Sequence, residues 1–173
     1  NDVREISASG RKAIVIGMEN GFPMGNDLRL LDIFYDYGAR YFGLLHNGHN
    51  DLGDSAVPAK GEDTAEHGGL SDLGKRVVAR LNELGIMVDI SHSGPQTALD
   101  AITLSKAPII ASHSAMKGLY DHPRNISDAA LDALKNSGGV VQVVAFDIYL
   151  RKPPEEKTAA VTALREEMGL TQP

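Results

Sequence analysis

A fivefold alternation of short apolar runs with amphipathic stretches constrains the fold of this chain most strongly. Each run is rich in Ile and Val and is apolar on both faces, which is typical of a strand buried in a parallel sheet. Strands that alternate with helices in this way indicate an α/β protein with a parallel sheet. The predicted strands cover residues 13–18, 41–45, 86–90, 108–111 and 140–146.

The stretches between these runs carry the residues that begin and end helices. Ser71 and Ser127 are placed to cap two helices, which Gly85 and Gly138 can end. Pro95 suits the first turn of a third helix. Two more helices are predicted, from Asn26 or Asp27 to Gly38 and from Glu155 to Met168. This pattern allows either an open, doubly wound sheet or a closed barrel.

Composition excludes several classes of function. Hydrophobic residues make up 42% of the chain and charged residues 23%, which is ordinary for a soluble globular protein. The net charge of -6, with scattered basic residues, argues against nucleic acid or an anionic membrane as the main partner. No apolar run approaches the roughly 18 residues of a membrane span. The absence of cysteine excludes disulfides and zinc–thiolate sites. The compartment stays open.

Metal-binding or proton-transferring side chains follow four of the five predicted strands. These side chains are Glu19, His46, His92 and His113. In a barrel the carboxyl ends of all strands meet at one face, so these four residues would converge there. Carboxylate and imidazole groups suit zinc, and a carboxylate can bridge two metal ions that share a hydroxide. A single histidine at a strand end is usually structural, but this combination favours a two-metal hydrolase.

Other polar residues carry weaker signals. His49, His67 and His122 are expected to be solvated loop residues, whereas Arg124 could form a surface salt bridge or bind a carboxylate through two hydrogen bonds. Asp89 could orient a metal ligand or cap buried backbone. Serines flank both His92 and His113, but adjacent strand residues point to opposite faces, so no nucleophile–base pair is expected. No dinucleotide-binding, Walker A or GxSxG motif is present.

Several segments resemble the membrane (renal) dipeptidase family, peptidase family M19. The resemblance runs from about Ala13 to Leu150 and includes Arg124-Asn125 after the strand that bears His113. It implies a parallel TIM-type (β/α)8 barrel, of which residues 1–173 would form a single domain with about five consecutive βα units. The segments that carry it are RYFGLLHN at 40–47, GLSDLG at 69–74, VDISH at 88–92 and PIIASHS at 108–114.

The resemblance also implies roles for individual residues. Glu19 would bridge two zinc ions, and His92 and His113 would both bind one of them. His46 would steady the substrate carbonyl or the tetrahedral oxyanion, and Arg124 would hold the carboxylate of a dipeptide. The implied function is zinc-dependent hydrolysis of dipeptides by a metal-bridged hydroxide, in a bacterial enzyme for which a homodimer is a further expectation.

This sequence departs from the family pattern in three places. No His-x-Asp pair precedes Glu19, and no late Gly-Asp-Phe-Asp-like segment follows Leu150, so the ligand set for two zincs is incomplete. Phe146 stands where some relatives have Tyr. Both missing motifs, and ends at Asn1 and Pro173 that look cut, lead us to expect an internal fragment. Two alternatives remain open: an amidohydrolase-like enzyme acting on a non-peptide amide or lactam, and a non-catalytic barrel that binds a carboxylated ligand.

Overall fold

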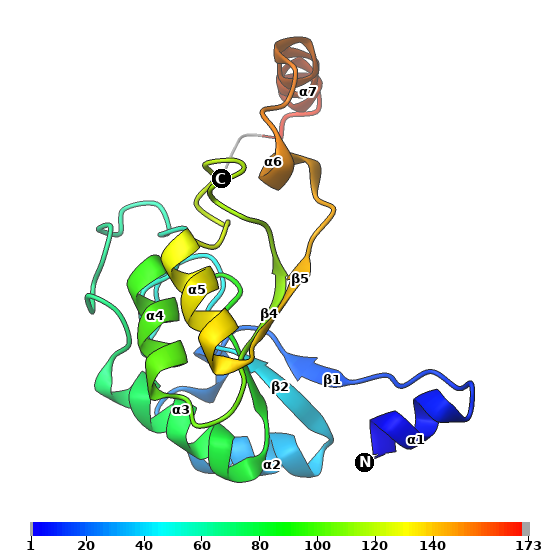
Figure 1. Cartoon of the computed structure of the whole chain (residues 1–173). Coiled ribbons are helices and arrows are strands. Elements are labelled where there is room, and N and C mark those ends of the chain that lie inside the picture. Colours follow the sequence, from blue (N-terminus) through cyan, green and yellow to red (C-terminus); the bar gives the residue numbers. More distant parts are fainter. Residues whose placement is uncertain (1, 171–173) are drawn as a thin grey trace.

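Five apolar segments form one parallel sheet, in which each strand lies beside the strand that precedes it in the sequence (Figure 1). The computed structural model describes residues 2–170. The register between the second and third strands pairs Phe42 with Val88 and Gly43 with Asp89. The strands are β1 (Ile16–Met18), β2 (Ala39–Gly43), β3 (Met87–Asp89), β4 (Ile110–Ser114) and β5 (Val140–Val143).

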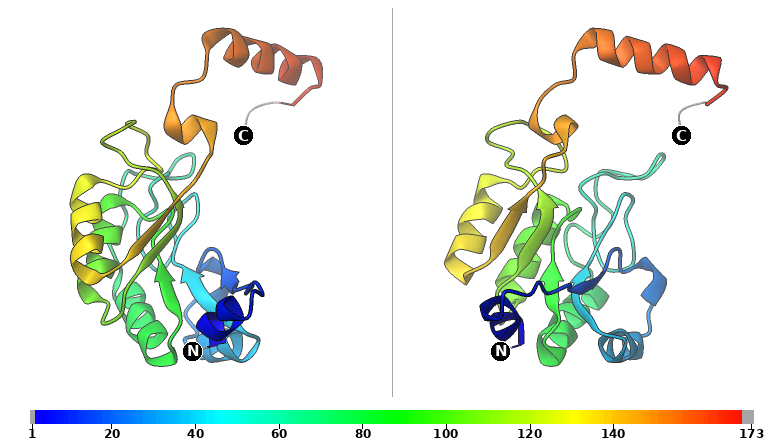
Figure 2. Two further views of the ribbon diagram at one scale, coloured as in Figure 1. Left: turned by 45° about the vertical axis from the view of Figure 1, so that its right-hand side comes forward. Right: turned by 90° about the vertical axis from the view of Figure 1, so that its right-hand side faces the viewer.

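The strand order distinguishes a barrel wall from a doubly wound sheet. A doubly wound sheet reverses its strand order at a switch point, whereas every new strand here is added on the same side of the last one. Four helices contact one another in sequence along the sheet (Figures 1 and 2). The prediction of consecutive βα units of a parallel barrel is therefore confirmed. These helices are α2 (Arg29–Asp36), α3 (Asp72–Leu84), α4 (Pro95–Leu104) and α5 (Asp128–Ser137).

Local sequence sets the ends of α3 and α5 as predicted. The Ser71 and Ser127 hydroxyls each accept a hydrogen bond from the backbone N–H three residues later. Gly85 and Gly138 follow the last turns with φ angles of 74° and 73°, a left-handed conformation that disfavours residues with a β-carbon. Both capping predictions are confirmed.

Several predicted boundaries were wrong. The segment predicted as a strand from residue 13 becomes one only at Ile16, and the segment predicted up to residue 146 ends its strand at Val143. The first predicted helix begins at Arg29, after Leu28, and Asp27 accepts a hydrogen bond from the Arg29 N–H just ahead of it. Three short elements were not predicted: α1 (Asp2–Ala8), the 3₁₀ turn η1 (Phe22–Met24) and α6 (Asp147–Leu150).

The buried core lies between the central strands and the helices. Phe42 and Val88 from the sheet and Val77 and Leu81 from α3 are at most 1% exposed and belong to one apolar cluster. The expectation that every strand is buried was wrong for β1 and β5, where Ile16 is 55% and Val140 54% exposed. Each of these two strands lies at an edge of the sheet and has a neighbouring strand on one side only.

The last helix, α7 (Glu155–Glu167), stands away from the sheet (Figure 2). It contains no buried residue, and it confirms the helix predicted at 155–168. None of the helices within residues 2–170 combines the length and the apolar character that crossing a bilayer requires. Residues 1 and 171–173 of the domain predicted over residues 1–173 lie outside the described range.

Candidate metal centre

The structure brings together four predicted side chains: Glu19, His46 and His92, which follow β1, β2 and β3, and His113, which lies near the end of β4. Glu19 Oε1 lies 3.4 Å from His92 Nε2 and 3.2 Å from His113 Nε2. The His46 and His92 rings are 4.2 Å apart between centroids, and ligand atoms of Glu19, His46 and His92 all lie within 4.8 Å of one another. One carboxylate and three imidazoles, separated by up to 94 positions in the sequence, thus share one site at the carboxyl ends of the strands.

A chain of hydrogen bonds fixes the orientation of His113. The Ser112 hydroxyl donates to the buried Asp89 carboxylate, and the same oxygen lies 2.8 Å from His113 Nδ1. Because the carboxylate takes the hydroxyl hydrogen, the Ser112 oxygen accepts the Nδ1 hydrogen of the imidazole. His113 Nε2 is then left with a free lone pair directed at Glu19, as in a histidine prepared for a metal ion.

The contact between Ser112 and His113 corrects the expectation from strand alternation. The pairing of β4 with β5 shifts its register between Ala111 and Ser114, which is an irregularity of the bulge type. At such a position adjacent side chains need not point to opposite faces. The Ser112 hydroxyl is nevertheless committed to Asp89, which also accepts hydrogen bonds from the Ser91 and Ser112 N–H groups. Asp89 therefore fills both of the roles considered for it, since it caps buried backbone and orients a candidate ligand.

His92 is oriented in the same way by another residue. Its Nδ1 lies 3.2 Å from the side-chain oxygen of Asn47, which can only accept, so Nδ1 carries the hydrogen and Nε2 faces Glu19. Its φ angle of 69° is unusual for a residue other than glycine and is typical of strained functional positions. Burial, helped by Arg124 and the neighbouring histidines, lowers the pKa of His92 to about 3. The imidazole is therefore neutral at physiological pH.

The turn that follows Glu19 is fixed by hydrogen bonds of Asn20. Asn20 has a φ angle of 73°, and its side-chain oxygen accepts hydrogen bonds from the Phe22 N–H and from the Asn50 amide. Asn50 also donates to the Leu44 carbonyl at the end of β2. This turn ties the end of β1 to the end of β2 and leaves the Glu19 carboxylate facing the histidines.

The donor set fits a divalent metal ion. Two imidazoles present their Nε2 atoms to one carboxylate oxygen, and each has its other nitrogen held by a hydrogen-bond acceptor. Carboxylate oxygen and imidazole nitrogen are ligands that zinc and similar metals take, and partners held in this way are usual around metal-binding histidines. A cation placed between them would contact the Glu19 carboxylate and both Nε2 atoms at once, so this arrangement favours a bound cation.

The long loop at residues 47–69 is ordered by Asp54, which is 5% exposed. Its carboxylate accepts hydrogen bonds from the N–H groups of Glu66, His67 and Gly69. Burial alone would raise the pKa of Asp54, but these three bonds outweigh it and leave the pKa below its ordinary value. The loop is therefore structured, since its two halves are tied together through Asp54.

Two expectations about polar residues were wrong. The His49 side chain is 1% exposed rather than solvated, because Nδ1 accepts a hydrogen bond from the Ser55 N–H and Nε2 bonds to the Asp63 carbonyl. Arg124 is 4% exposed, and within residues 2–170 it forms no ion pair, so it is no surface salt bridge. His67 is exposed, as expected, and His122 is half-buried against Tyr149.

Arg124 lies behind His113. Its Nη2 donates to the His113 carbonyl at 3.3 Å, and its guanidinium carbon is 5.3 Å from the centre of the Tyr149 ring on α6. Burial lowers the pKa of the Arg124 guanidinium, while Tyr149, and after it Asp89 and Glu19, act in the opposite direction. A buried cation near the candidate ligands, with no carboxylate of its own, is suited to binding a substrate carboxylate.

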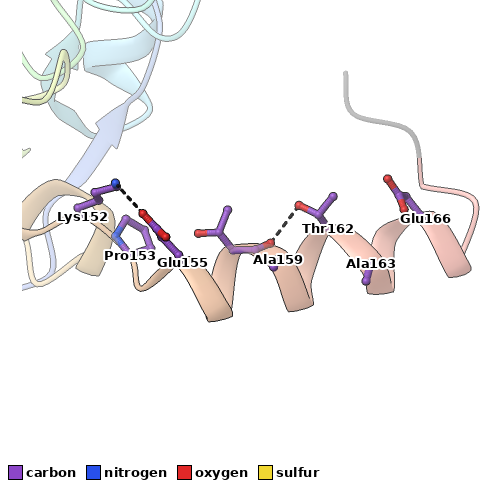
Figure 3. A pocket seen from close by; sticks show the side chains of 8 residues that line it. Lys152, Pro153, Glu155, Ala159, Thr162, Ala163 and Glu166 are labelled. Atoms are coloured by element: carbon purple, nitrogen blue, oxygen red, sulfur yellow. Dashed lines mark hydrogen bonds and ion pairs between the residues drawn. The ribbon is translucent and has the colours of Figure 1, made fainter.

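The groove along α7 is separate from this centre. It is lined by one face of the helix and the residues just before it (Figure 3). Lys152 and Glu155 form an ion pair there at 3.4 Å, and the Thr162 hydroxyl donates to the Thr158 carbonyl. No histidine is among the residues that line the groove, so it does not share the metal-binding character of the centre at the strand ends.

Comparison with known proteins identifies the arrangement. The sequence model of the membrane dipeptidase family, peptidase family M19, matches residues 1–168. The chain belongs to this family. Among family relatives, an uncharacterised dipeptidase of Schizosaccharomyces pombe is 39% identical over 144 residues, which are 83% of this chain and 34% of that protein.

Solved structures agree with the family assignment. The probable dipeptidase PvdM of Pseudomonas aeruginosa is 42% identical, with a TM-score of 0.86 over 98% of this chain and 43% of that one. A metallopeptidase of Rhodobacter sphaeroides, liganded with a phosphinate mimic of the dipeptide L-Ala-D-Ala, is 27% identical, with a TM-score of 0.75 over 97% of this chain and 50% of that one. This chain spans about a third of the curated relative and up to half of these structures.

Membership of a metallopeptidase family agrees with the metal-binding character of the donor set. Sequence reasoning missed Asn47 and Ser112, which orient His92 and His113 in this M19 chain. Asn47 directly follows His46 and Ser112 directly precedes His113, so both lay beside residues already singled out. A polar residue next to a histidine in the sequence does not by itself indicate whether it orients that histidine or is an ordinary polar loop residue.

Proposed function

We propose that the intact protein is a zinc-dependent dipeptidase. The observation that carries the proposal is that Glu19 faces the Nε2 atoms of two histidines whose Nδ1 atoms are both held by acceptors. Family membership supports a metallopeptidase, and the dipeptide mimic bound by the Rhodobacter sphaeroides relative supports a dipeptide as substrate. A homodimer, tested by light scattering, belongs to the same proposal.

The candidate residues would have separate roles in metal binding and in substrate binding. Glu19, His92 and His113 would hold zinc. When bound, zinc acts as a Lewis acid and lowers the pKa of coordinated water. His46, whose ring lies 4.2 Å from that of His92, would donate a hydrogen bond to the substrate carbonyl as negative charge develops on its oxygen.

Arg124 would set the length of the substrate. A guanidinium buried behind His113 would pair with the terminal carboxylate of a short peptide whose scissile carbonyl lies near the histidines. A longer peptide would place an uncharged amide beside this buried cation, which costs binding free energy. Dipeptides are therefore favoured over longer peptides.

The deciding experiment compares two histidine variants of the intact protein loaded with zinc. His113→Ala removes a proposed ligand, and we expect it to lower kcat/KM for dipeptides by at least about a hundredfold and to reduce the zinc content. His67→Ala removes an exposed histidine outside the centre and is the matched control. Unchanged zinc content and turnover in His113→Ala would refute the assignment.

A substrate panel separates dipeptidase activity from the alternatives. L,L-, L,D- and D,D-dipeptides are compared with a lactam and with a non-peptide amide. Hydrolysis that is confined to the lactam or the amide would favour the amidohydrolase alternative. Binding of a carboxylated ligand without zinc and without hydrolysis would favour a non-catalytic barrel.

A further inference from the structure

Three buried side-chain atoms have no hydrogen-bond partner among residues 2–170. They are Ser93 Oγ, Arg124 Nε and Asn125 Oδ1. Arg124 is 4% and Asn125 6% exposed, so bulk water does not solvate these groups. Buried polar atoms without a partner are rare in folded proteins because each loses its hydration without compensation. Three such atoms that lie close together in space therefore call for a common explanation.

All three residues line the same internal cavity. Its volume is about 20 Å³, and it lies behind Arg124, between the ends of β3 and β4 and the helices α4 and α5. A cavity needs on the order of 10–15 Å³ to hold one water molecule, so this one holds one and no larger ligand. The rest of its wall is mostly apolar and includes Ile90, Ala98, Ile126 and Ala130.

We propose that this cavity is a binding site for a single structural water molecule that bridges Ser93, Arg124 and Asn125. The hydrogen-bond capacities match. The Nε–H of Arg124 donates to the water oxygen, the water donates to Asn125 Oδ1, and the Ser93 hydroxyl can donate or accept. A buried water typically makes about three such bonds, which is the number available here.

The orientation of Asn125 is set independently of the cavity. Its Nδ2 donates to the Tyr120 and Tyr149 carbonyls, each at 2.8 Å. Both amide hydrogens are therefore engaged elsewhere, and Oδ1 is the atom left for the cavity. The site consequently requires a ligand that both donates and accepts hydrogen bonds.

This requirement excludes small ions. A cation would lie against the Arg124 guanidinium, and a halide has no hydrogen to give to Asn125 Oδ1. Chloride and bromide are also larger than a water molecule. Water is neutral, fits the volume and supplies both a donor and an acceptor.

The bound water would position Arg124 for its substrate, a consequence that rests on the proposed function. The guanidinium is held at Nη2 by the His113 carbonyl and would be held at Nε by the water. These two anchors use one Nη2 hydrogen and the Nε hydrogen, so the other Nη hydrogens are not used by either of them. Ser93 and Asn125 are then positioning residues that act through the water on Arg124.

The first experiment is a high-resolution crystal structure of the intact protein, with a second crystal grown in sodium bromide. We expect one density peak within hydrogen-bond distance of all three atoms and no anomalous signal at that peak in bromide. An empty cavity, a bromide signal, or side chains that pair directly with one another would overturn the proposal. This result does not depend on whether the protein hydrolyses dipeptides.

The second experiment measures the effect on substrate binding. Ser93→Ala removes one partner of the water, and we expect KM for a dipeptide to rise about three- to tenfold with little change in kcat. Ser93→Thr should restore KM, and Ser137→Ala, which removes a hydroxyl bonded within α5, is the control. With a C-terminally amidated dipeptide the difference between wild type and Ser93→Ala should disappear, because Arg124 has no carboxylate to bind.

Ser93 directly follows His92, so zinc content is measured in every variant. Unchanged zinc with a raised KM supports a positioning role. Lost zinc, or an equal effect on the free and amidated dipeptides, would overturn that role. If the wild-type protein hydrolyses no dipeptide, the proposed function fails while the crystal structures still decide the water site.

Discussion

Glu19 Oε1 lies 3.2 Å from His113 Nε2, although the two residues are separated by three βα units. The contact exists because parallel strands of a barrel wall deliver their carboxyl ends to one face. The orientation of the imidazole depends on Ser112 and Asp89 rather than on the barrel. The fold therefore brings the residues together, and a local hydrogen-bond chain makes them a usable donor set.

Ser112→Ala tests the hydrogen-bond chain. Loss of the hydroxyl frees the Nδ1 hydrogen of His113 and leaves Asp89 with fewer donors, so zinc affinity should fall about 10- to 100-fold. Affinity is measured by competition with a chromophoric chelator. Ser137→Ala is the control, and equal zinc affinity in the two variants would mean that Ser112 does not orient His113.

The pH dependence of apoprotein stability tests the environment of His92. Its pKa is about 3 in the folded protein against an ordinary 6.5. Between these two values the unfolded chain binds a proton at His92 that the folded chain does not bind. Stability is then fully retained above about pH 6.5 and is lost as the pH falls toward 3. The loss attributable to His92 should be about 2 kcal/mol at about pH 5.

The measurement is urea unfolding in EDTA at about pH 7.5 and pH 5, for wild type and His92→Asn. Asparagine tolerates the left-handed backbone at this position but does not titrate. The wild-type protein should therefore lose more stability than the variant as the pH falls. Equal losses would show that burial does not depress the pKa of His92.

The arrangement of strands and helices was largely predictable, because it depends on local patterns. Ser71, Gly85, Ser127 and Gly138 fix helix ends through groups only a few residues away. The convergence of Glu19, His46, His92 and His113 was also predictable, since a parallel sheet puts all strand ends on one side.

The features that were not predicted depend on tertiary packing. Arg124 and His49 are polar loop residues in sequence, and only the packing around them shows that they are buried. The contact between Ser112 and His113 depends on an irregular strand pairing that alternation rules do not anticipate. The cavity at Ser93 depends on three segments whose spacing no periodicity encodes.

Gly74→Ala tests the packing of α3 against the loop at residues 47–69. Alanine normally stabilises a helix interior by about 0.5–1 kcal/mol relative to glycine. A β-carbon at Gly74, however, would overlap the Leu52 carbonyl oxygen and crowd the Leu70 side chain. We therefore expect Gly74→Ala to lower the free energy of unfolding by about 1–3 kcal/mol, measured by denaturant unfolding. Arg76→Ala, at an exposed position of the same helix, should change stability little, and a stabilised Gly74→Ala would contradict this packing.

Metal stoichiometry of the 173-residue chain tests how many zinc ions its own ligands can bind. Glu19, His92 and His113 can surround one ion, whereas a second ion would share Glu19 and have at most His46, with no histidine pair of its own among the described residues. A zinc ion with so few protein ligands is bound weakly, because structural and catalytic sites usually have three or four.

We therefore expect less than two zincs per chain, weak affinity and little dipeptide hydrolysis from the purified 173 residues, measured by titration calorimetry and elemental analysis. His113→Ala in the same chain should reduce even this binding, and tight binding of two zincs by the unmodified chain would show that its ligand set is larger than Glu19 and its facing histidines.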